Sequence, residues 1–432
     1  MWNDKHVAIA GFGIEGQSVL KFLRRSGVKK VTILDESGKV NITGISDVDT
    51  ITGQNAFSNL SEFDVVFRSP SINPRRLDHK NVTSSTQVFF QYANAKIIGV
   101  TGSKGKGTTA TLIYEILKAS SITAHLIGNI GIPALDVLQD INQQDVVVFE
   151  LSSFQLWDLE NSPEIAVVLM VEPEHLDIHD NLDDYIAAKS NITAHQRNED
   201  FVTYHPGNKY SQEIALKSSG RKVKYLTPQG AYVENGVIKI DQQEILNVNQ
   251  LRLIGTHNLE NICAAVTASW QITKDINAIR KVLSNFSGLK HRLEYIASTD
   301  GVKYYNDSIG TTPTSAIAAI SAFSAPVIAI MGGSSKGHDY SLMAEKMAHL
   351  NNLKRVILIG QTADSIARNL RKSGFDQGKI SRVDSLQEAV NLARDCADSG
   401  EIVVLAPAAA SFDMFKNYQD RGEQFIKAVQ NL

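Results

Sequence analysis

A chain of 432 residues is too long for a single hydrophobic core and predicts roughly two to four domains. Its composition, 43% hydrophobic and 21% charged, is that of an ordinary globular protein, and a formal net charge of -3 argues against binding to nucleic acid. With two cysteines, no apolar leader and no apolar run of bilayer length, we expect a cytoplasmic protein without disulfides or membrane contact that acts on small molecules.

The first expected element is a strand at residues 7–10, which runs into a Gly-x-Gly-x-x-Gly turn at 11–16 and a helical stretch. A second strand, 31–34, ends at Asp35, at the spacing where an acidic side chain reaches a ribose. With only one more strand, 64–67, we expect a half-sized Rossmann-like domain over residues 1–89 that holds one nucleotide. A purely structural tight turn, or NAD or FAD binding, are the alternatives.

The stretch from Ile97 to Thr109 predicts a strand, a phosphate-binding loop and the start of a helix. Glycines in such a loop let backbone N–H groups converge on phosphate oxygens, and Lys106 adds a full positive charge to the helix N-terminus. Only two residues separate Gly102 from Gly105, and Gly107 stands where Ser or Thr usually follows the loop lysine. A glycine-rich turn with exposed lysines is therefore the other interpretation.

The central part of the chain alternates strands and helices, with strands expected at 96–101, 124–127, 145–151, 164–171 and 199–204. This pattern predicts a P-loop ATPase-like doubly wound sheet over residues 90–288. Between 221 and 253 the runs become short and alternating around Asn235-Gly236, a pair typical of hairpin turns. A small antiparallel insert is expected there.

Polar residues with possible chemical roles follow the central strands. Glu150 ends the strand before it and is placed to hold Mg²⁺, while His175 is a metal ligand, a proton carrier or only a structural hydrogen-bonding group. Lys189 lies in a helical stretch, either snorkelling to solvent or desolvated, with a lowered pKa that lets its amine take up CO₂. Asn258 and Asn261 share a helix face and either read a purine edge or cap the helix.

The last part of the chain, 289–432, predicts a second Rossmann-like domain. Parallel strands are expected at 327–330, 356–359 and 402–405, and an antiparallel pair near 293–296 and 303–307. Polar loops at 306–308, 332–339 and 407–413 each follow a strand, and carboxyl ends of parallel strands are where such sheets bind ligands.

Several of these segments, taken in order over nearly the whole chain, resemble the Mur ligases. They are Thr101-Gly102-Ser103-Lys104-Gly105-Lys106, Gly128-Asn129-Ile130-Gly131, Glu150-Leu151-Ser152-Ser153-Phe154-Gln155-Leu156, Ala187-Ala188-Lys189, His257-Asn258 with Asn261, His291-Arg292, Asn306-Asp307-Ser308 and Phe415-Lys416-Asn417-Tyr418. The resemblance implies a three-domain, monomeric, ATP- and Mg²⁺-dependent amide ligase of peptidoglycan precursor synthesis. Its reaction would add D-glutamate to the alanyl carboxylate of UDP-N-acetylmuramoyl-L-alanine through an acyl phosphate.

The resemblance also implies roles for individual residues. It implies that uridine diphosphate is bound by Gly11, Phe12, Gly13, Ile14, Asp35, Glu36 and Ser71. It implies that ATP is bound by Gly102, Ser103, Lys104, Gly105, Lys106, Gly107, Thr108, Thr109, Asn258, Asn261, Arg292 and Asp307. It implies that the muramoyl substrate and glutamate are bound by Asn129, Ser152, Gln155, Thr311, Lys336, Ser411 and Tyr418. The catalytic residues would be Lys106, Glu150, His175 and Lys189, and the metal ligands Thr108, Glu150, His175 and Lys189, the last as a carbamate.

Two departures from the family pattern leave alternatives open. Gly107 resembles the loop of folylpolyglutamate synthases, so a ligase of that kind is one alternative, and Thr108 or water would replace the usual hydroxyl ligand of the metal. Ile309-Gly310 replaces a Lys-Ala pair, which removes a cation and resembles enzymes that add L-glutamate. Outside the ligases, the glycine turn with Asp35 also fits an NAD(P)-dependent oxidoreductase, and a catalytically inactive nucleotide-binding regulator is the third alternative.

Overall fold

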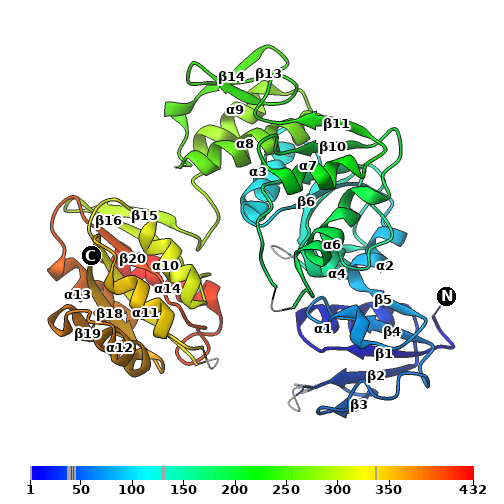
Figure 1. The fold of residues 1–432 in the computed structure, drawn as a ribbon, viewed down its shortest axis with the longest axis horizontal. Helices are drawn as coiled ribbons and strands as arrows, with labels where there is room; N and C mark the ends of the chain where they lie inside the picture. Colours follow the sequence, from blue (N-terminus) through cyan, green and yellow to red (C-terminus); the bar gives the residue numbers. More distant parts are fainter. Residues whose placement is uncertain are drawn as a thin grey trace. The chain divides into compact units, whose positions relative to one another are not determined.

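The computed structural model describes residues 2–36, 40, 42, 45–128, 132–176, 178–253, 255–335 and 338–432. The chain forms two compact units, Met1–Phe286 and Ser287–Leu432, which are drawn in Figure 1 and described here one at a time. Among the described residues, no helix has the length and apolar character needed to cross a membrane. The domain limits expected near residues 89 and 288 stay predictions.

The first sheet of the N-terminal unit has five parallel strands in the order β3-β2-β1-β4-β5. The strands are β1 His6–Ala10, β2 Lys30–Asp35, β3 Asp49–Thr52, β4 Val65–Arg68 and β5 Val82–Ser84. Three of them were expected, whereas β3 is wholly exposed and β5 has three residues, so neither carries an apolar pattern. The sheet is therefore larger than the half-sized domain that the sequence predicted.

The second sheet is also parallel throughout, in the order β11-β10-β9-β6-β8-β7. Its strands are β6 Lys96–Thr101, β7 Ala124–Gly128, β8 Val146–Glu150, β9 Ile165–Val168, β10 Phe201–Tyr204 and β11 Arg221–Lys224. The helices of this unit are α1 Ile14–Arg25, α2 Ser85–Tyr92, α3 Lys106–Ala119, α4 Ala134–Val137, α5 Ser153–Leu156, α6 Leu182–Ala194, α7 Lys209–Leu216, α8 Thr256–Ser269 and α9 Ile276–Asn285, with 3-10 turns at Pro74–Arg76 and Val248–Gln250.

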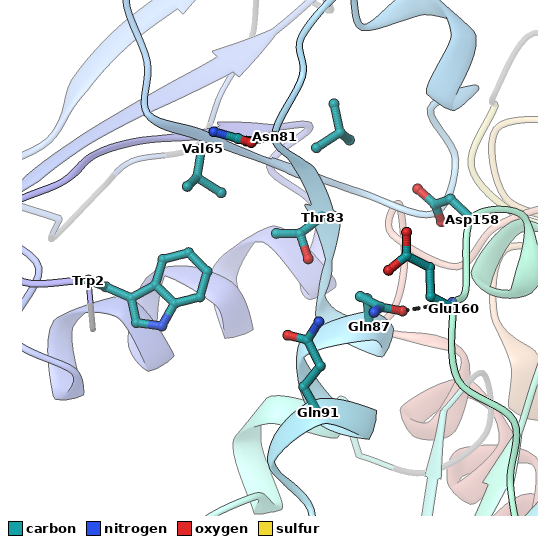
Figure 2. Close-up of a pocket in the computed structure, with 9 residues that line it drawn as sticks. Trp2, Val65, Asn81, Thr83, Gln87, Gln91, Asp158 and Glu160 are labelled. Atoms are coloured by element: carbon teal, nitrogen blue, oxygen red, sulfur yellow. Dashed lines mark hydrogen bonds between the residues drawn. The ribbon is translucent and has the colours of Figure 1, made fainter.

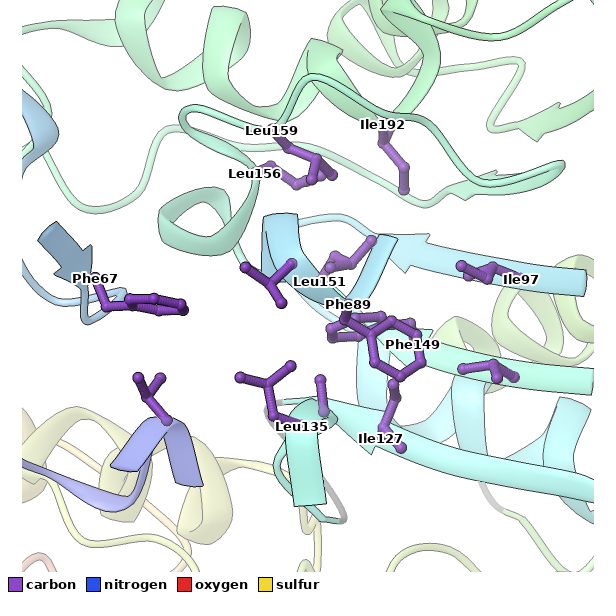
Figure 3. Packing of buried hydrophobic residues seen from close by; sticks show 14 of the residues in the cluster. Phe67, Phe89, Ile97, Ile127, Leu135, Phe149, Leu151, Leu156, Leu159 and Ile192 are labelled. Carbon is purple, nitrogen blue, oxygen red and sulfur yellow. The ribbon is translucent and has the colours of Figure 1, made fainter. Parts of the chain in front are cut away.

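Helices cover both faces of the second sheet, as the doubly wound pattern predicted. Helices α3, α8 and α9 pack on one face with Ile98 and Val148, while α2, α6 and α7 pack on the other with Ile97 and Phe149. The second of these clusters continues into the first sheet through Phe67, as Figure 3 shows. One hydrophobic core thus holds the two sheets together, which explains why they form a single unit.

The antiparallel insert expected around Asn235-Gly236 is confirmed. It contains β12 Tyr232–Glu234, β13 Val237–Ile240 and β14 Gln243–Asn247, paired in that order. Asn235 and Gly236 have φ values of 51° and 76°. Positive φ at both central residues is the geometry of the tight turn that matches the twist of a hairpin.

The C-terminal unit holds a six-stranded sheet in the order β15-β16-β20-β17-β18-β19. Its strands are β15 Glu294–Thr299, β16 Val302–Asn306, β17 Val327–Gly332, β18 Leu353–Ile359, β19 Ile380–Arg382 and β20 Ile402–Leu405. Only β15 is antiparallel to its neighbour, as expected. The helices are α10 Pro313–Ser321, α11 Ser341–Ala348, α12 Ala363–Lys372, α13 Leu386–Cys396 and α14 Tyr418–Gln430, with a 3-10 turn at Gln377–Lys379. The α/β fold class predicted from the sequence is confirmed.

Candidate active site

The phosphate loop connects β6 to the N-terminus of α3, as the sequence predicted. Lys106 begins α3, and its amine folds back over the loop to donate to the carbonyls of Gly102 (3.0 Å) and Ser103 (2.8 Å). Gly105 precedes the helix with φ of 83°. The loop therefore presents a helix N-terminus and a half-buried cation at the carboxyl end of a parallel strand, the arrangement that binds phosphate in nucleotide-binding sheets.

Side chains from other elements hold this loop in place. The hydroxyl of Ser103 donates to the Glu172 carbonyl (2.8 Å), accepts from the Glu172 N–H (2.8 Å) and lies 3.0 Å from the Tyr185 hydroxyl. On the other side, the Thr109 hydroxyl donates weakly to Asn261 Oδ1 (3.5 Å), and Asn261 Nδ2 donates to Asn258 (3.1 Å). The two asparagines thus lie at the start of α8 against the loop.

Lys189 of α6 is buried beside the same loop. Its amine donates to the Gly102 carbonyl (2.9 Å) and to the Thr101 hydroxyl (3.3 Å), so Lys106 and Lys189 share one carbonyl oxygen. Burial lowers the pKa of the Lys189 amine well below its usual value, and the neighbouring positive charge of Lys106 lowers this pKa further. Of two ammonium groups so close together, the buried one loses its proton first.

Glu150 ends β8 opposite the phosphate loop. The register pairs Glu150 with Val100, directly before the loop, and the Glu150 side chain is buried, with 2% of the residue exposed. Among the described residues, no group of three His, Cys, Asp or Glu side chains is arranged to hold a metal ion. Mg²⁺ needs fewer protein ligands than that, since it keeps several waters and binds through one or two carboxylates plus substrate phosphates. Glu150 fits this requirement, and Thr108 adds a half-buried hydroxyl in the first turn of α3.

The histidine that the sequence singled out differs from the one that the structure buries. His175 is exposed, has φ of 56° and lies against the ring of Phe154 at 4.9 Å between centroids. His179 is 2% exposed, and its ring nitrogens lie 3.0 Å from Asp184 and 3.0 Å from the Ser153 hydroxyl. Burial lowers the pKa of the His179 imidazole, which favours its neutral form.

Two predicted substrate residues belong to the cap of α5. Ser152 is the N-cap residue: its hydroxyl accepts from the Gln155 N–H (3.3 Å), and the Gln155 side-chain oxygen accepts from the Ser152 N–H (3.0 Å). This capping box fixes the one-turn helix that follows Glu150. Asn129, the third residue expected on the muramoyl substrate, lies outside the described residues.

The predicted uridine site lies at the carboxyl end of the first sheet. The Asp35 carboxylate accepts from the Phe12 N–H (3.0 Å), and the Ser69 hydroxyl donates to the Gly11 carbonyl (2.7 Å). Gly13 is the N-cap of α1, and Ile14 is 75% exposed beside it. Close by in sequence, Glu36 pairs with Arg76 at 2.5 Å and Ser71 is exposed.

The C-terminal unit contains the remaining predicted ATP residues, Arg292 and Asp307. Asp307 is 5% exposed and accepts from the Leu293 N–H (3.1 Å). Burial raises the pKa of the Asp307 carboxyl to about 7, although the hydrogen bond and Arg292 act in the opposite direction. A Cβ at Gly310 would lie 2.3 Å from Asp307 Oδ2, so the glycine that departs from the family pattern makes room for this carboxyl group.

A buried arginine of α14, Arg421, joins two loops at the strand ends of this unit. Its guanidinium donates to the Ser308 hydroxyl and carbonyl (3.0 and 2.8 Å) and to the carbonyls of Ala409 and Ala410 (3.0 and 3.1 Å). Ser411 follows directly and is 2% exposed. Tyr418 begins α14, and its carbonyl accepts from Ser308 (2.8 Å). Of the other predicted glutamate residues, Thr311 is half-buried and Lys336 lies outside the described residues.

Among the buried polar residues that sequence reasoning missed are Arg68, His179 and Arg421. The only signal for Arg68 was its place at the end of an apolar strand, and for Arg421 its place in the amphipathic helix after Tyr418. A pocket of about 230 Å³ that none of the predicted residues lines is drawn in Figure 2. It lies between β5, α2 and Glu160, whose N–H donates to Gln87 (3.0 Å).

Comparison with known proteins gives matches over nearly the whole chain. Family models described as "Mur ligase middle domain" and "Mur ligase, glutamate ligase domain" match residues 100–269 and 291–409. The chain is 37% identical, over an alignment 454 positions long, to the UDP-N-acetylmuramoylalanine--D-glutamate ligase of Clostridium tetani, with 99% of this chain and 97% of that protein covered. MurF from Acinetobacter baumannii has the same fold with a TM-score of 0.60 at 17% identity, covering 98% of this chain and 90% of that one. MurF from Thermotoga maritima in complex with ADP gives a TM-score of 0.57 at 16% identity, covering 98% and 95%.

Proposed function

The chain belongs to the Mur ligase family, and from that premise we propose that it joins D-glutamate to the alanyl carboxylate of UDP-N-acetylmuramoyl-L-alanine, with conversion of ATP to ADP and phosphate. One observation carries the proposal: the loop at the head of α3 gathers two lysine amines on the Gly102 carbonyl, with the buried Glu150 on the neighbouring strand. The similarity to D-glutamate ligases over nearly the full length supports the choice of substrates.

The chemistry requires activation of the carboxylate. A carboxylate does not react with an amine at neutral pH, because oxide would have to leave. Transfer of the γ-phosphoryl group of ATP to a carboxylate oxygen releases ADP and gives an acyl phosphate. The glutamate amine, after losing its proton, then attacks the acyl carbon, the carbon–oxygen bond to phosphate breaks, and the amide and inorganic phosphate are released.

The residues at the loop bring two anions, ATP and the carboxylate, together. Backbone N–H groups at the start of α3 and the Lys106 amine hold the phosphates by charge-assisted hydrogen bonds. Glu150, His175, Thr108 and the modified Lys189 would hold Mg²⁺, which when bound neutralises the phosphate oxygens during transfer. The Lys106 amine, which donates to the Gly102 and Ser103 carbonyls, would turn toward a phosphate oxygen when ATP binds.

We also propose that Lys189 is carbamylated. Addition of CO₂ needs the unprotonated amine, forms an N–C bond and releases one proton, and the lowered pKa of the buried Lys189 favours that form. The carbamate would then be an anion beside the cationic Lys106 amine, so the modification replaces a repulsion between like charges with an attraction.

The other residue roles rest on the family resemblance and remain proposals. These are uridine diphosphate at the turn that contains Gly11, glutamate at the loops that contain Ser411, and ATP at Arg292 and Asp307. The proposal further includes action as a cytoplasmic monomer in peptidoglycan precursor synthesis.

The test is phosphate release by the purified protein with Mg²⁺, ATP, UDP-N-acetylmuramoyl-L-alanine and one glutamate enantiomer at a time. We expect release with D-glutamate, and loss of it in Lys106→Ala. Lys118→Ala is the matched control, because Lys118 lies on the same helix and packs over the Tyr114 ring away from the loop. Release with L-glutamate alone would correct the stereochemistry and agree with the Ile309-Gly310 departure, while release with neither enantiomer would refute the ligase assignment.

A further inference from the structure

Arg68 is a fully buried arginine that bonds to two separate parts of the N-terminal unit. It ends β4, and its side chain is 0% exposed. Toward the first sheet, Nη1 donates to the carbonyls of Ser69 (3.3 Å), Pro70 (3.2 Å) and Ile72 (3.0 Å). These carbonyls flank Ser71 in the sequence, and the family resemblance places Ser71 at the uridine nucleotide.

The other side of the same guanidinium binds the segment that contains α5. Nη2 donates to the Phe154 carbonyl (3.0 Å), and Nε and Nη2 form a two-point ion pair with the Asp158 carboxylate (3.0 and 2.5 Å). Phe154 lies within α5, two residues after Ser152, which the family resemblance places at the muramoyl substrate. One side chain therefore binds both the loop of residues 69–72, which we call the nucleotide loop, and the segment that follows Glu150.

An arginine side chain can connect two separate segments in this way better than any other side chain. Its five N–H groups lie in one rigid plane, so acceptors on both sides are held at fixed positions relative to each other. Lysine has the same charge but a flexible ammonium with three donors, which cannot match this geometry. Burying a charge is costly unless it is paired and hydrogen-bonded, and here every nitrogen of the guanidinium has an acceptor.

We propose that Arg68 is a positioning residue that fixes the span between the uridine end and the carboxylate end of the bound substrate; this inference rests on the proposed function. A substrate that binds at two places gains affinity from their connection only when the two places are held at a matching distance. Weakening the contacts of Arg68 should therefore leave the binding of uridine diphosphate alone unchanged and weaken the binding of the complete substrate.

The experiment compares two dissociation constants by calorimetry, one for UDP and one for UDP-N-acetylmuramoyl-L-alanine. Asp158→Asn is the first variant, because it removes the ion pair on the α5 side and leaves the bonds of Arg68 to the nucleotide loop in place. We expect its affinity for UDP to stay within about twofold of the original and its affinity for the complete substrate to fall about tenfold or more. Arg68→Lys should act in the same direction, and it provides a second measurement if Asp158→Asn does not fold.

Asp180→Asn is the matched control. Asp180 also pairs with an arginine that follows β4, Arg75, at 2.6 Å, but the two side chains are 61% and 53% exposed. An exposed ion pair contributes little, so both affinities should stay near those of the unaltered protein. If the unaltered protein does not bind the complete substrate more tightly than UDP, the proposed function fails. If it does, and Asp158→Asn and Arg68→Lys keep the same ratio of the two constants, the positioning role of Arg68 is overturned.

Discussion

Replacing Gly105 with alanine tests whether the phosphate loop depends on the close approach of Asn261. Gly105 has φ of 83°, and an added Cβ would lie 2.2 Å from Asn261 Oδ1. The positive φ alone costs about 1–2 kcal/mol for an L-residue. The displaced amide also loses its hydrogen bonds to Thr109 and Asn258, at about 1 kcal/mol each. We therefore expect Gly105→Ala to lower the free energy of unfolding by about 3–4 kcal/mol.

Scanning calorimetry should show this loss as a fall of roughly 5–7 °C in the melting midpoint of the N-terminal unit. ATP binding, measured by titration calorimetry, should weaken in the same variant because the loop amides no longer converge. Gly53→Ala is the matched control, since Gly53 has φ of 97° and no atom within 4 Å of an added Cβ. It should cost only the backbone strain, about 1–2 kcal/mol.

The double variant Gly105→Ala with Asn261→Ala separates the cost of the positive φ at residue 105 from the cost of the clash with the Asn261 side chain. Asn261→Ala by itself already loses the two hydrogen bonds and removes the atom that the Gly105→Ala methyl group would meet. The double variant should thus be more stable than the sum of the single losses by about 1–2 kcal/mol. Losses that simply add, or a Gly105→Ala protein with unchanged melting and ATP affinity, would refute this reasoning.

Two further predictions concern buried ionisable groups. Lys189→Ala should abolish phosphate release, and short carboxylic acids should partly restore it by supplying the missing anion; full activity without rescue would rule out the carbamate. Burial raises the pKa of Asp307 to about 7, above its value in the unfolded chain, so its contribution to stability is full below about pH 4 and is lost as the pH rises through about 7. The melting midpoint of the unaltered protein, measured relative to that of Asp307→Asn, should therefore fall as the pH rises from about 4 to about 7. A difference in melting midpoint that does not vary with pH would contradict the raised pKa of Asp307.

The strands that were predicted well from the sequence are buried on both faces and therefore consist of continuous runs of apolar residues. Strands β6 and β8 were expected at 96–101 and 145–151, and the structure has them at Lys96–Thr101 and Val146–Glu150 with nearly every residue buried. Strand β3 has four exposed residues and lies at the edge of its sheet. It pairs with β2 in parallel through the backbone, and such pairing leaves no trace in the side-chain pattern.

Local motifs in the sequence named candidate site residues, but they did not indicate how these residues are arranged in space. Lys106 and Lys189 each belong to a local motif, whereas their meeting on the Gly102 carbonyl depends on how α6 packs against the second sheet. In the sequence, Arg68 is a charged residue at the end of a strand, and its burial depends on contacts with both the 69–72 loop and the α5 segment. His175 and His179 precede α6 in irregular backbone, where no periodicity indicates which ring points inward.

The core shared by the first two sheets limits how this enzyme can be recombined with its relatives. Phe67 of the first sheet and Phe149 of the second belong to one apolar cluster, so a chimaera joined near residue 90 would set two unmatched surfaces against each other. A crossover at Phe286–Ser287 divides the chain between its two compact units instead. Exchange of the C-terminal unit, where we propose that glutamate binds, is therefore the more practical route to introducing a different amino-acid specificity.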